Sequence, residues 1–391
     1  MMTIKIIKLL LAGICFSLLF GKLNAAAVFS AESNAVALFG DFNLAYFNRL
    51  PSVNTYDFMK NNQYYSTVGA SVENTSLENF TVALVVDVRI NNKFYYPENI
   101  DKDYYRSLEV NQLYLELKDA AGSTTLGNFN SKVISSTVDA TNKAGIFLLD
   151  AAFSFTGASS GIFGEYAESD FSTRKIYQGI GHYDKSSNFI IAAEFESPRD
   201  NLNARNAFEE GAFNRRFSAG AAVGYAGEAV GASVGYKRIE NKLNAEFDSI
   251  DFKKSIINSD NILGSVYINL SKFYLALSGG YYYNLKIAGV NHVGASALIS
   301  YRLSKLRTYA GYQLLYAGNI HKYGSIYGMA DNKDYSFDQS VAVFGLSYEA
   351  FTGFMMGIEH SNDIRTKLQR QSSLLNNSNN DITAVYLKYS F

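Results

Sequence analysis

The chain has 391 residues, with 35 lysines and arginines against 36 aspartates and glutamates, and a single cysteine. A charge this close to neutral argues against nucleic acid as a partner, and one cysteine excludes a disulfide framework. Tyrosine and phenylalanine are abundant (29 and 28 residues) and proline is scarce (3 residues), a composition that favours β structure.

The first 27 residues predict a cleaved secretory signal peptide. Met1–Lys8 carries two lysines and no acid, Leu9–Phe20 is apolar, and small residues follow at Ala25 and Ala27. This order of basic, apolar and small residues is typical of a secretory signal, and the apolar block is too short to span a bilayer as a helix. We expect cleavage after Ala27, with Ala25 as the alternative.

Residues 28–391 are then expected to form one exported domain of 364 residues (391 − 27). The signal takes three lysines and Cys15 with it, so the exported chain has no cysteine and a net charge of −4 (32 basic against 36 acidic residues). The apolar runs that follow the signal are shorter than the roughly 18 residues of a membrane-spanning helix, which argues against a helical membrane protein.

Strict alternation of apolar and polar residues recurs along the exported chain and predicts half-buried strands. It is clearest in Asn79–Ile90, where Phe80 and Leu84 fall on the face opposite Asp87. The pattern predicts sixteen strands, at residues 36–47, 64–74, 79–90, 108–117, 123–128, 174–183, 188–197, 216–226, 228–240, 261–270, 273–284, 290–302, 305–317, 339–349, 353–362 and 381–391.

The connections between these segments alternate between long and short. Long connections cover residues 48–63, 91–107, 129–173, 198–215, 241–260, 319–338 and 363–380, with 285–289 as the exception, and short ones fall between them. A soluble β protein has no general reason to sort its connections in this way, but a transmembrane barrel has tight periplasmic turns and long external loops. The predicted fold class is therefore all-β: a 16-stranded antiparallel transmembrane β-barrel.

The final segment, ITAVYLKYSF, predicts the strand that closes the barrel against the first one. Large residues spaced two apart end on the terminal phenylalanine: Val385, Leu387, Tyr389 and Phe391. A paired closing strand does not fray, and a terminal aromatic side chain belongs at the membrane interface. We expect these four residues to face lipid and the residues between them, including Tyr386, to face the lumen.

Charged residues recur on the faces predicted to lie inside the barrel: Asp87, Arg89, Glu116, Glu194, Lys237, Arg302, Glu359 and Lys388. Unpaired charges would be very costly in a dry core, so their number indicates a water-filled lumen and hence a channel. Tyrosines are also predicted to point inward, at Tyr114, Tyr274, Tyr282 and Tyr386. They leave open a substrate-selective channel with an aromatic track.

Four stretches give the chain a resemblance to the general porins of Gram-negative outer membranes. They are the signal peptide, Asn111–Asn128 (NQLYLELKDAAGSTTLGN), Arg174–Ser197 (RKIYQGIGHYDKSSNFIIAAEFES) and the closing YLKYSF. The resemblance implies a homotrimeric passive diffusion channel for small hydrophilic solutes and ions, whose third loop, 129–173, folds into the lumen. The family's Pro-Glu-Phe-Gly-Gly turn is replaced by Gly161–Tyr166 (GIFGEY), which has no proline.

The resemblance also implies a constriction at which acids on the third loop face bases on the wall. The candidate residues are Arg89, Arg106, Arg174, Asp139, Asp150, Glu165, Glu168 and Asp170. Arg89 is the first choice because the alternation places it inward. Arg174 is next, because the predicted orientation of its strand leaves Arg174 and His182 inside. For any single loop acid, an ordinary solvated residue is the alternative interpretation.

Two further roles follow from the resemblance. Acids of the second long loop are candidates for a latch onto a neighbouring subunit, with an exposed polar loop as the alternative: Glu98, Asp101 and Asp103. The closing strand is a candidate signal for the outer-membrane barrel assembly machinery, through Phe391, Tyr389, Leu387 and Val385. The other partners expected are outer-membrane lipid and lipopolysaccharide.

No arrangement typical of catalysis is found in the sequence. The four histidines, His182, His292, His321 and His360, lack a metal-like spacing, and no nucleophile can be matched with a base. We expect no enzymatic activity, no cofactor and no metal site. The alternatives to an open porin are the substrate-selective porin, a non-conducting surface adhesin or structural barrel, and a soluble secreted β protein.

Overall fold

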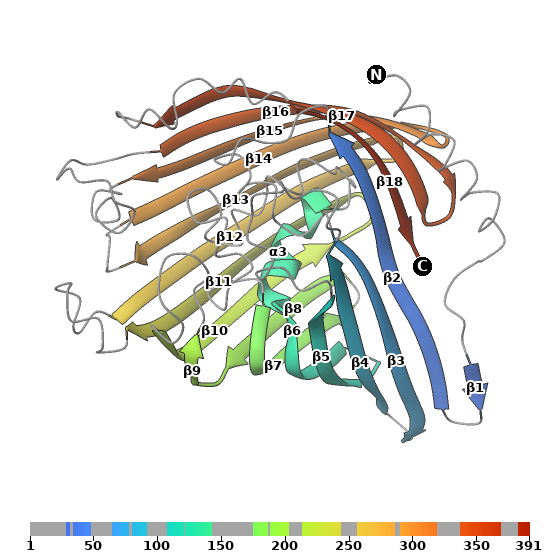
Figure 1. Ribbon diagram of the computed structural model, residues 1–391, viewed down its shortest axis with the longest axis vertical. Helices are drawn as coiled ribbons and strands as arrows, with labels where there is room; N and C mark the ends of the chain where they lie inside the picture. The colour runs from blue at the N-terminus through green and yellow to red at the C-terminus, as the bar shows by residue number, and fades with distance from the viewer. Residues whose placement is uncertain are drawn as a thin grey trace.

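The computed structural model describes residues 29–31, 34–47, 65–77, 80–91, 108–120, 122–142, 175–186, 188–202, 213–243, 256–285, 290–318, 337–368 and 382–391. Their strands form a single antiparallel sheet that closes on itself (Figure 1). Among the helical residues described, none forms a helix both long and apolar enough to cross a membrane.

Sixteen long strands form the barrel, and the prediction of this fold class is confirmed. They are β2 (Asn34–Phe47), β3 (Tyr65–Leu77), β4 (Phe80–Asn91), β5 (Leu108–Lys118), β6 (Gly122–Asn130), β7 (Lys175–Ser186), β8 (Phe189–Glu196), β10 (Phe213–Ala226), β11 (Val230–Leu243), β12 (Ile256–Leu270), β13 (Phe273–Leu285), β14 (Val290–Leu303), β15 (Leu306–Gly318), β16 (Phe337–Phe351), β17 (Phe354–Leu368) and β18 (Ile382–Ser390). Pairing of β18 with β2 closes the ring. Two short strands, β1 (Phe29–Ala31) and β9 (Arg199–Leu202), pair with β2 and β10.

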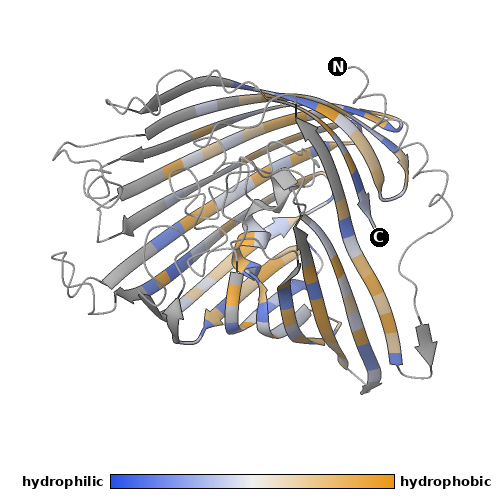
Figure 2. Ribbon diagram, viewed as in Figure 1, coloured by the Kyte–Doolittle hydropathy of each residue, from blue (hydrophilic) through white to orange (hydrophobic). Residues whose placement is uncertain are grey.

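The strands alternate between an apolar outer face and a polar inner face, as the sequence pattern predicts. On β4, Leu84 is 47% exposed whereas Asp87 is 4% exposed, and on β8, Ile191 is 53% exposed whereas Glu194 is 5% exposed. Figure 2 shows the resulting alternation of hydropathy along the strands. An outer face of this kind is unfavourable in water and is stabilised by contact with hydrocarbon.

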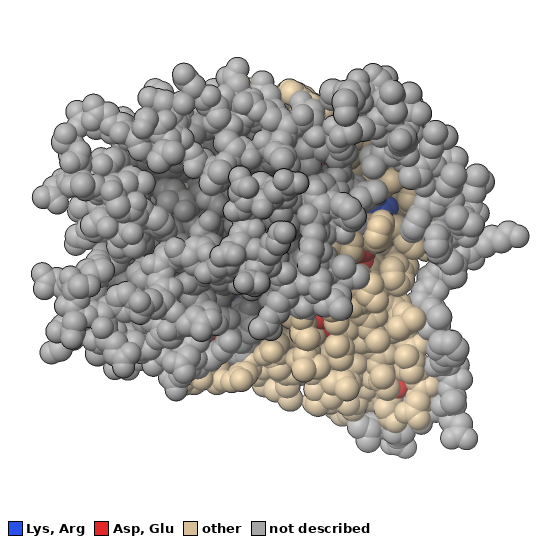
Figure 3. All heavy atoms as spheres, viewed as in Figure 1, with Lys and Arg blue, Asp and Glu red and all other residues tan. Residues whose placement is uncertain are grey.

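Charge is sparse on the part of the surface that can be seen. In the view of Figure 3, the described residues form a mostly uncharged surface with single acidic and basic residues lying apart. In that view the described residues therefore present no large charged patch.

The last residue of the chain closes the barrel. The Phe391 N–H donates to the Gly40 carbonyl oxygen, and the Gly40 N–H donates to the Phe391 carbonyl oxygen, each at 3.0 Å. A β-carbon at Gly40 would lie 3.0 Å from the Phe391 ring, so the glycine provides the space for the ring. The Ser390 hydroxyl adds a hydrogen bond to the Asp41 carboxylate. The terminal phenylalanine is thus tied to β2 by backbone and side chain.

The side chains of the closing strand form an aromatic cluster at this end of the barrel. Leu387 and Tyr389 pack against Phe354, Phe351 is stacked on Phe354 at 5.0 Å between ring centroids, and Tyr389 is stacked on Phe391 at 5.7 Å. Leu387 and Tyr389 are 7% and 8% exposed. These two side chains are therefore buried, whereas the sequence predicted open contact with lipid. The role of the strand as an assembly signal stays a prediction.

The orientation predicted for β7 is wrong. Ile180 is 44% exposed, and His182 lies on the same outer face, with its Nδ1 atom 3.0 Å from the Thr124 hydroxyl. Gly181 faces inward, where a β-carbon would lie 2.6 Å from the Phe129 ring. His182 is therefore outside, not inside.

Two local features explain the error on β7. The pairing of β6 with β7 is irregular between Gly127 and Phe129, and Gln178 has a left-handed backbone with a φ of 52°. A β-bulge of this kind shifts the alternation of side chains by one residue. The glycines of β7 also weaken the contrast in hydropathy from which the orientation was predicted.

Candidate functional site

The first part of the third long connection forms a helix inside the barrel, which the sequence did not predict. α3 (Lys132–Asn142) begins just after β6 and lies within the ring of strands (Figure 1). Val133, Ile134 and Thr137 recur at helical spacing and are buried, so this side of the helix packs on the inner wall. The rest of the loop, 143–173, lies outside the described residues, and its path into the lumen stays a prediction.

Glu194 of β8 holds the start of α3. Its carboxylate accepts hydrogen bonds from the Ser131 hydroxyl at 2.6 Å and from the Val133 N–H at 3.2 Å, and it pairs with the Lys237 ammonium at 2.8 Å. A carboxylate at a helix N-terminus satisfies an N–H group that the helix leaves free and opposes the helix dipole. Both side chains of the ion pair are 0% exposed, so these contacts offset the loss of water.

Two glycines leave the space that α3 fills. A β-carbon at Gly235 would lie 2.7 Å from Cγ2 of Thr137, and one at Gly220 would lie 3.2 Å from Cγ2 of Val133. Val133 also packs with small residues, Ala192 and Ala222. The wall made by β8, β10 and β11 is therefore shaped by small residues for close approach of the helix.

A second polar group lines the inner wall of β3 and β5. Lys118 pairs with Glu73 at 3.1 Å and with Glu116 at 3.5 Å. The Lys118 side chain is 40% exposed, unlike that of Lys237. This ion pair network therefore lies partly open to solvent, where ion pairs contribute little to stability.

Asp87 of β4 lies on the same inner wall and has one carboxylate oxygen without a partner. Its Oδ2 atom accepts from the side-chain amide of Asn111 at 2.5 Å and from that of Gln112 at 3.3 Å. Its Oδ1 atom is buried and accepts no hydrogen bond from any described residue. A buried carboxylate oxygen left in this state is costly, and it favours a hydrogen-bond donor or a cation nearby.

Lys132, the first residue of α3, extends over two aromatic rings of the wall. Its ammonium lies 5.9 Å from the ring centroids of both Tyr114 and Phe129, which contact each other edge to face at 6.5 Å. Burial is the largest effect on the Lys132 pKa and lowers it from its ordinary value, although Glu116 and Glu194 oppose that shift.

A third polar cluster lies on the inner wall of β15, β17 and β18. The Tyr309 hydroxyl donates to the Glu359 carboxylate and lies 3.2 Å from the Tyr386 hydroxyl. Glycines make room for both rings: a β-carbon at Gly345 would lie 2.2 Å from the Tyr309 ring, and one at Gly357 would lie 2.4 Å from the Tyr386 ring. The predicted inward orientation of Tyr386 is confirmed.

Protein partners, rather than water alone, satisfy several of the inward charges that the sequence predicted. Glu194, Lys237 and Glu359 are 5%, 0% and 0% exposed and have the partners given above. The pair between Arg302 and Glu349, at 2.8 Å, is open, with side chains 50% and 42% exposed. The inner wall thus combines sealed polar clusters with exposed charges.

The candidate constriction residues are mostly beyond the described part of the chain. Arg89 lies in β4, paired with Thr67 of β3 and Glu109 of β5, and Asp139 lies in α3, but the described structure does not extend to either side chain. The remaining candidates lie outside the described residues: Arg106, Arg174, Asp150, Glu165, Glu168 and Asp170, together with the latch candidates Glu98, Asp101 and Asp103. The roles of all of them stay predictions.

The sequence did not predict a role for Lys132 or the contact between Glu194 and α3. The signal that points to them is the segment directly after β6, where Val133, Ile134 and Thr137 have a helical spacing and follow a lysine.

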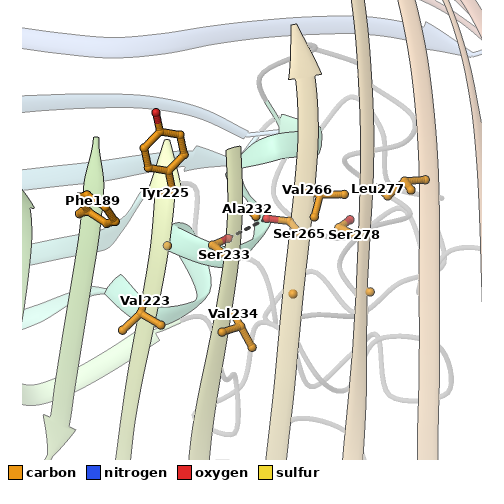
Figure 4. Close-up of a pocket in the computed structure, with 13 residues that line it drawn as sticks. Phe189, Val223, Tyr225, Ala232, Ser233, Val234, Ser265, Val266, Leu277 and Ser278 are labelled. Carbon is orange, nitrogen blue, oxygen red and sulfur yellow. Dashed lines mark hydrogen bonds between the residues drawn. The ribbon is translucent and has the colours of Figure 1, made fainter. Parts of the chain in front are cut away.

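A shallow apolar hollow lies on the outer face between β8 and β13 (Figure 4). Its volume is about 610 Å³, and its lining includes Val223, Val234, Val266 and Leu277, all of them strongly exposed. Gly264 and Gly279 deepen it, because neither carries a side chain. Its apolar lining suits hydrocarbon and offers little to a hydrophilic solute.

Comparison with solved structures identifies the class of fold. OmpF of Salmonella typhi, in complex with daunomycin, has a TM-score of 0.63 and 14% identity over 93% of this chain and 100% of that chain. The anion-selective porin from Comamonas acidovorans has a TM-score of 0.58 and 12% identity over 92% and 100%. A trimer form of OmpT from Vibrio cholerae has a TM-score of 0.57 and 11% identity over 92% and 100%.

No family model matches the sequence, and no curated protein matches it. At such low identities the likeness to solved structures establishes the fold alone. The barrel has the fold of the Gram-negative outer-membrane porins, and the resemblance drawn from the sequence is confirmed at that level.

Proposed function

We propose that this protein is an outer-membrane porin, a passive diffusion channel for small hydrophilic solutes and ions. The observation that carries the proposal is the closed sixteen-stranded barrel with an apolar outer face and a polar, charged inner face. Only a closed barrel or a helix satisfies all backbone groups in a bilayer, and a barrel of this strand number leaves an aqueous channel. The location that follows is the bacterial outer membrane, in contact with lipid and lipopolysaccharide.

A homotrimer is the assembly that we propose. One solved neighbour of the same fold is a trimer form, and the family resemblance implies the same state. The assembly machinery is the partner expected to read the closing strand, whose last residue is held by β2. Size-exclusion chromatography with light scattering in detergent measures the mass of the assembly, and a monomer would contradict the proposal.

The constriction is proposed to combine the third loop with the inner wall. The support for this is that α3 lies inside the ring of strands; the candidate acids and arginines of the sequence would supply the charge. The exported chain carries a net charge of −4 (32 basic against 36 acidic residues), which favours a weak preference for cations, although charges at a constriction outweigh net charge.

Current through single molecules in a planar bilayer tests the proposal. An open porin gives stable, ohmic steps, and a trimer closes in threes. Saturation of the current by one solute, with competition between solutes, would instead identify a substrate-selective porin. A protein that folds as a heat-modifiable barrel but passes no current would contradict the porin proposal and favour an adhesin or structural barrel. Extraction without detergent would point to a soluble β protein.

A further inference from the structure

Among the described residues, aromatic rings and no carboxylate contact the Lys132 ammonium. It lies 5.9 Å from the centroids of Tyr114 and Phe129, a distance at which a cation is attracted to a ring face. No described residue forms an ion pair or a hydrogen bond with this ammonium. Within the described part of the chain, the rings therefore bind a positive charge that has no acid in direct contact.

The acids around Lys132 already have partners of their own. Glu116, two residues from Tyr114 on the inner face of β5, pairs with Lys118 at 3.5 Å, and Glu194 pairs with Lys237 at 2.8 Å. Both acids still act on Lys132 through space. Lys132 is thus not needed to neutralise either of them, and its placement over the rings needs another explanation.

An acceptor without a partner lies on the same wall. Gln112, Tyr114 and Glu116 follow one another on the inner face of β5, and Gln112 donates to Asp87 of the neighbouring strand at 3.3 Å. The Oδ1 atom of Asp87 accepts no hydrogen bond although the residue is only 4% exposed. Aromatic faces beside carboxylate oxygens are the surroundings that bind ammonium groups in proteins.

The backbone is adapted to keep this arrangement open. A β-carbon at Gly181 would lie 2.6 Å from the Phe129 ring and 3.2 Å from Cγ of Lys132, and Gly127, with a φ of +127°, would place one 3.0 Å from the Tyr114 backbone. Side chains at these two positions would push the rings and the lysine stem apart. The glycines therefore preserve the contact between the lysine and both rings.

We propose that Tyr114, Phe129 and Glu116 form a cation subsite on the lumen wall, and that the Lys132 side chain occupies it as a tethered competitor of solute ammonium groups. The inference rests on the proposed function, because it assigns the subsite to a conducting lumen. Lys132 then holds down the cation preference of the channel, and its removal opens the subsite to organic ammonium ions.

The test compares Lys132→Met with Lys272→Met, which removes the same charge from the exposed turn between β12 and β13. Reversal potentials are measured in a potassium chloride gradient, and tetramethylammonium is then added to one side. We expect Lys132→Met to raise the permeability ratio of cation to anion about threefold, from the loss of one nearby charge, and to make the current sensitive to tetramethylammonium. Lys272→Met should leave both properties as they are in the unmodified protein.

A second measurement does not depend on conduction. Tetramethylammonium binding to each variant in detergent micelles is followed by nuclear magnetic resonance of the ligand, and Tyr114→Leu added to Lys132→Met should abolish the binding. A protein that passes no current but binds the ion in Lys132→Met would contradict the proposed function and support the subsite. A conducting protein in which Lys132→Met neither binds the ion nor changes the permeability ratio would overturn the subsite.

Discussion

Two lysines on the inner side of the barrel show two ways of keeping a positive charge there. Lys237 is 0% exposed and its ammonium lies 2.8 Å from the Glu194 carboxylate, which also holds the start of α3. Lys132 lies on α3 itself, and in the part of the chain that the structure describes its ammonium contacts two rings and no carboxylate. Lys237 is held in a buried ion pair, whereas the Lys132 ammonium can be displaced from the rings by another cation.

The difference indicates that some charged residues of the inner wall stabilise the fold, whereas others set the ion selectivity of the channel. A buried charge whose partner is removed is left uncompensated at high cost, so the Glu194–Lys237 pair must stay intact for the fold. A cation on an aromatic face gains about 0.5–2 kcal/mol, which is small enough for a solute to compete. We therefore expect substitutions at the first lysine to change stability and substitutions at the second to change ion selectivity.

The largest expected effect comes from Glu194→Gln. This change removes the carboxylate charge that pairs with the buried Lys237 ammonium at 2.8 Å, and the loss of stability should be about 3–5 kcal/mol. The midpoint of thermal unfolding, followed by heat-modifiable mobility on a gel, measures it. Glu349→Gln is the matched control, because the Glu349–Arg302 pair has the same 2.8 Å separation but side chains 42% and 50% exposed. The control substitution should lower the free energy of unfolding by less than about 1 kcal/mol.

A rescue variant separates charge from packing at the same site. Replacing both partners, with Glu194→Leu and Lys237→Met, removes the uncompensated charge and should recover most of the stability. Equal losses for Glu194→Gln and Glu349→Gln would show that burial of the first pair does not matter, and would remove the basis of the comparison between the two lysines.

The sequence predicted the barrel well because the hydropathy of a strand repeats every two residues. Leu84 against Asp87 and Ile191 against Glu194 have strong contrasts, and both were placed on the correct faces. On β7 the contrast is weak, since Gly179 and Gly181 carry no side chain, and the irregularity next to Gly127 shifts the register. A bulge of this kind is set by pairing with β6, and pairing is not visible in one strand's own pattern.

The polar clusters could be predicted only in part. Alternation placed Glu194, Lys237 and Glu359 inward but did not say what they contact, because their partners come from segments distant in the chain. The distance between Glu194 and Ser131 in sequence is 63 residues. Lys132 was missed because the short helix α3 lies in a segment assigned to a loop, and because glycines on other strands create the space it uses.

The next largest effect is expected from Gly235→Ala, which tests whether α3 sits against the wall near Lys237. The added β-carbon would lie 2.7 Å from Thr137 and 3.1 Å from Val133, so the helix must move, at a cost of about 1–3 kcal/mol. Gly264→Ala is the control, because a β-carbon there would meet only the Ser233 carbonyl oxygen, at 3.5 Å. Chemical denaturation compares the two, and a control as unstable as Gly235→Ala would argue against the helix contact.

Replacing each of the two lysines with arginine should have a smaller effect on stability, and the effect should differ between the two sites. Lys237→Arg places a larger group in a fully buried site and should destabilise the protein by about 1–3 kcal/mol. Lys132→Arg keeps the charge and stacks well on aromatic rings, so it should leave stability and reversal potential almost unchanged. Thermal unfolding and the reversal potential are measured for both variants. A change of selectivity in Lys132→Arg as large as in Lys132→Met would show that charge at this position is not what matters.

The smallest expected effect is a shift of selectivity with pH and no loss of fold. Burial lowers the Lys132 pKa from its ordinary value, so this ammonium loses its proton at a lower pH than an exposed lysine does. Glu116 of β5 and Glu194 of β8 are the acidic groups that act on it through space. The cation preference, measured as the reversal potential in a salt gradient, should therefore increase on the alkaline side before exposed lysines titrate.

The Lys132→Met variant decides whether that shift belongs to Lys132. It retains the other titratable groups of the neighbouring wall, namely Tyr114 and Lys118 of β5 and Lys237 of β11. If the reversal potential of this variant stays constant over the same pH range, the shift in the unmodified protein is assigned to Lys132. An equal shift in both proteins would assign it to those other groups and not to Lys132.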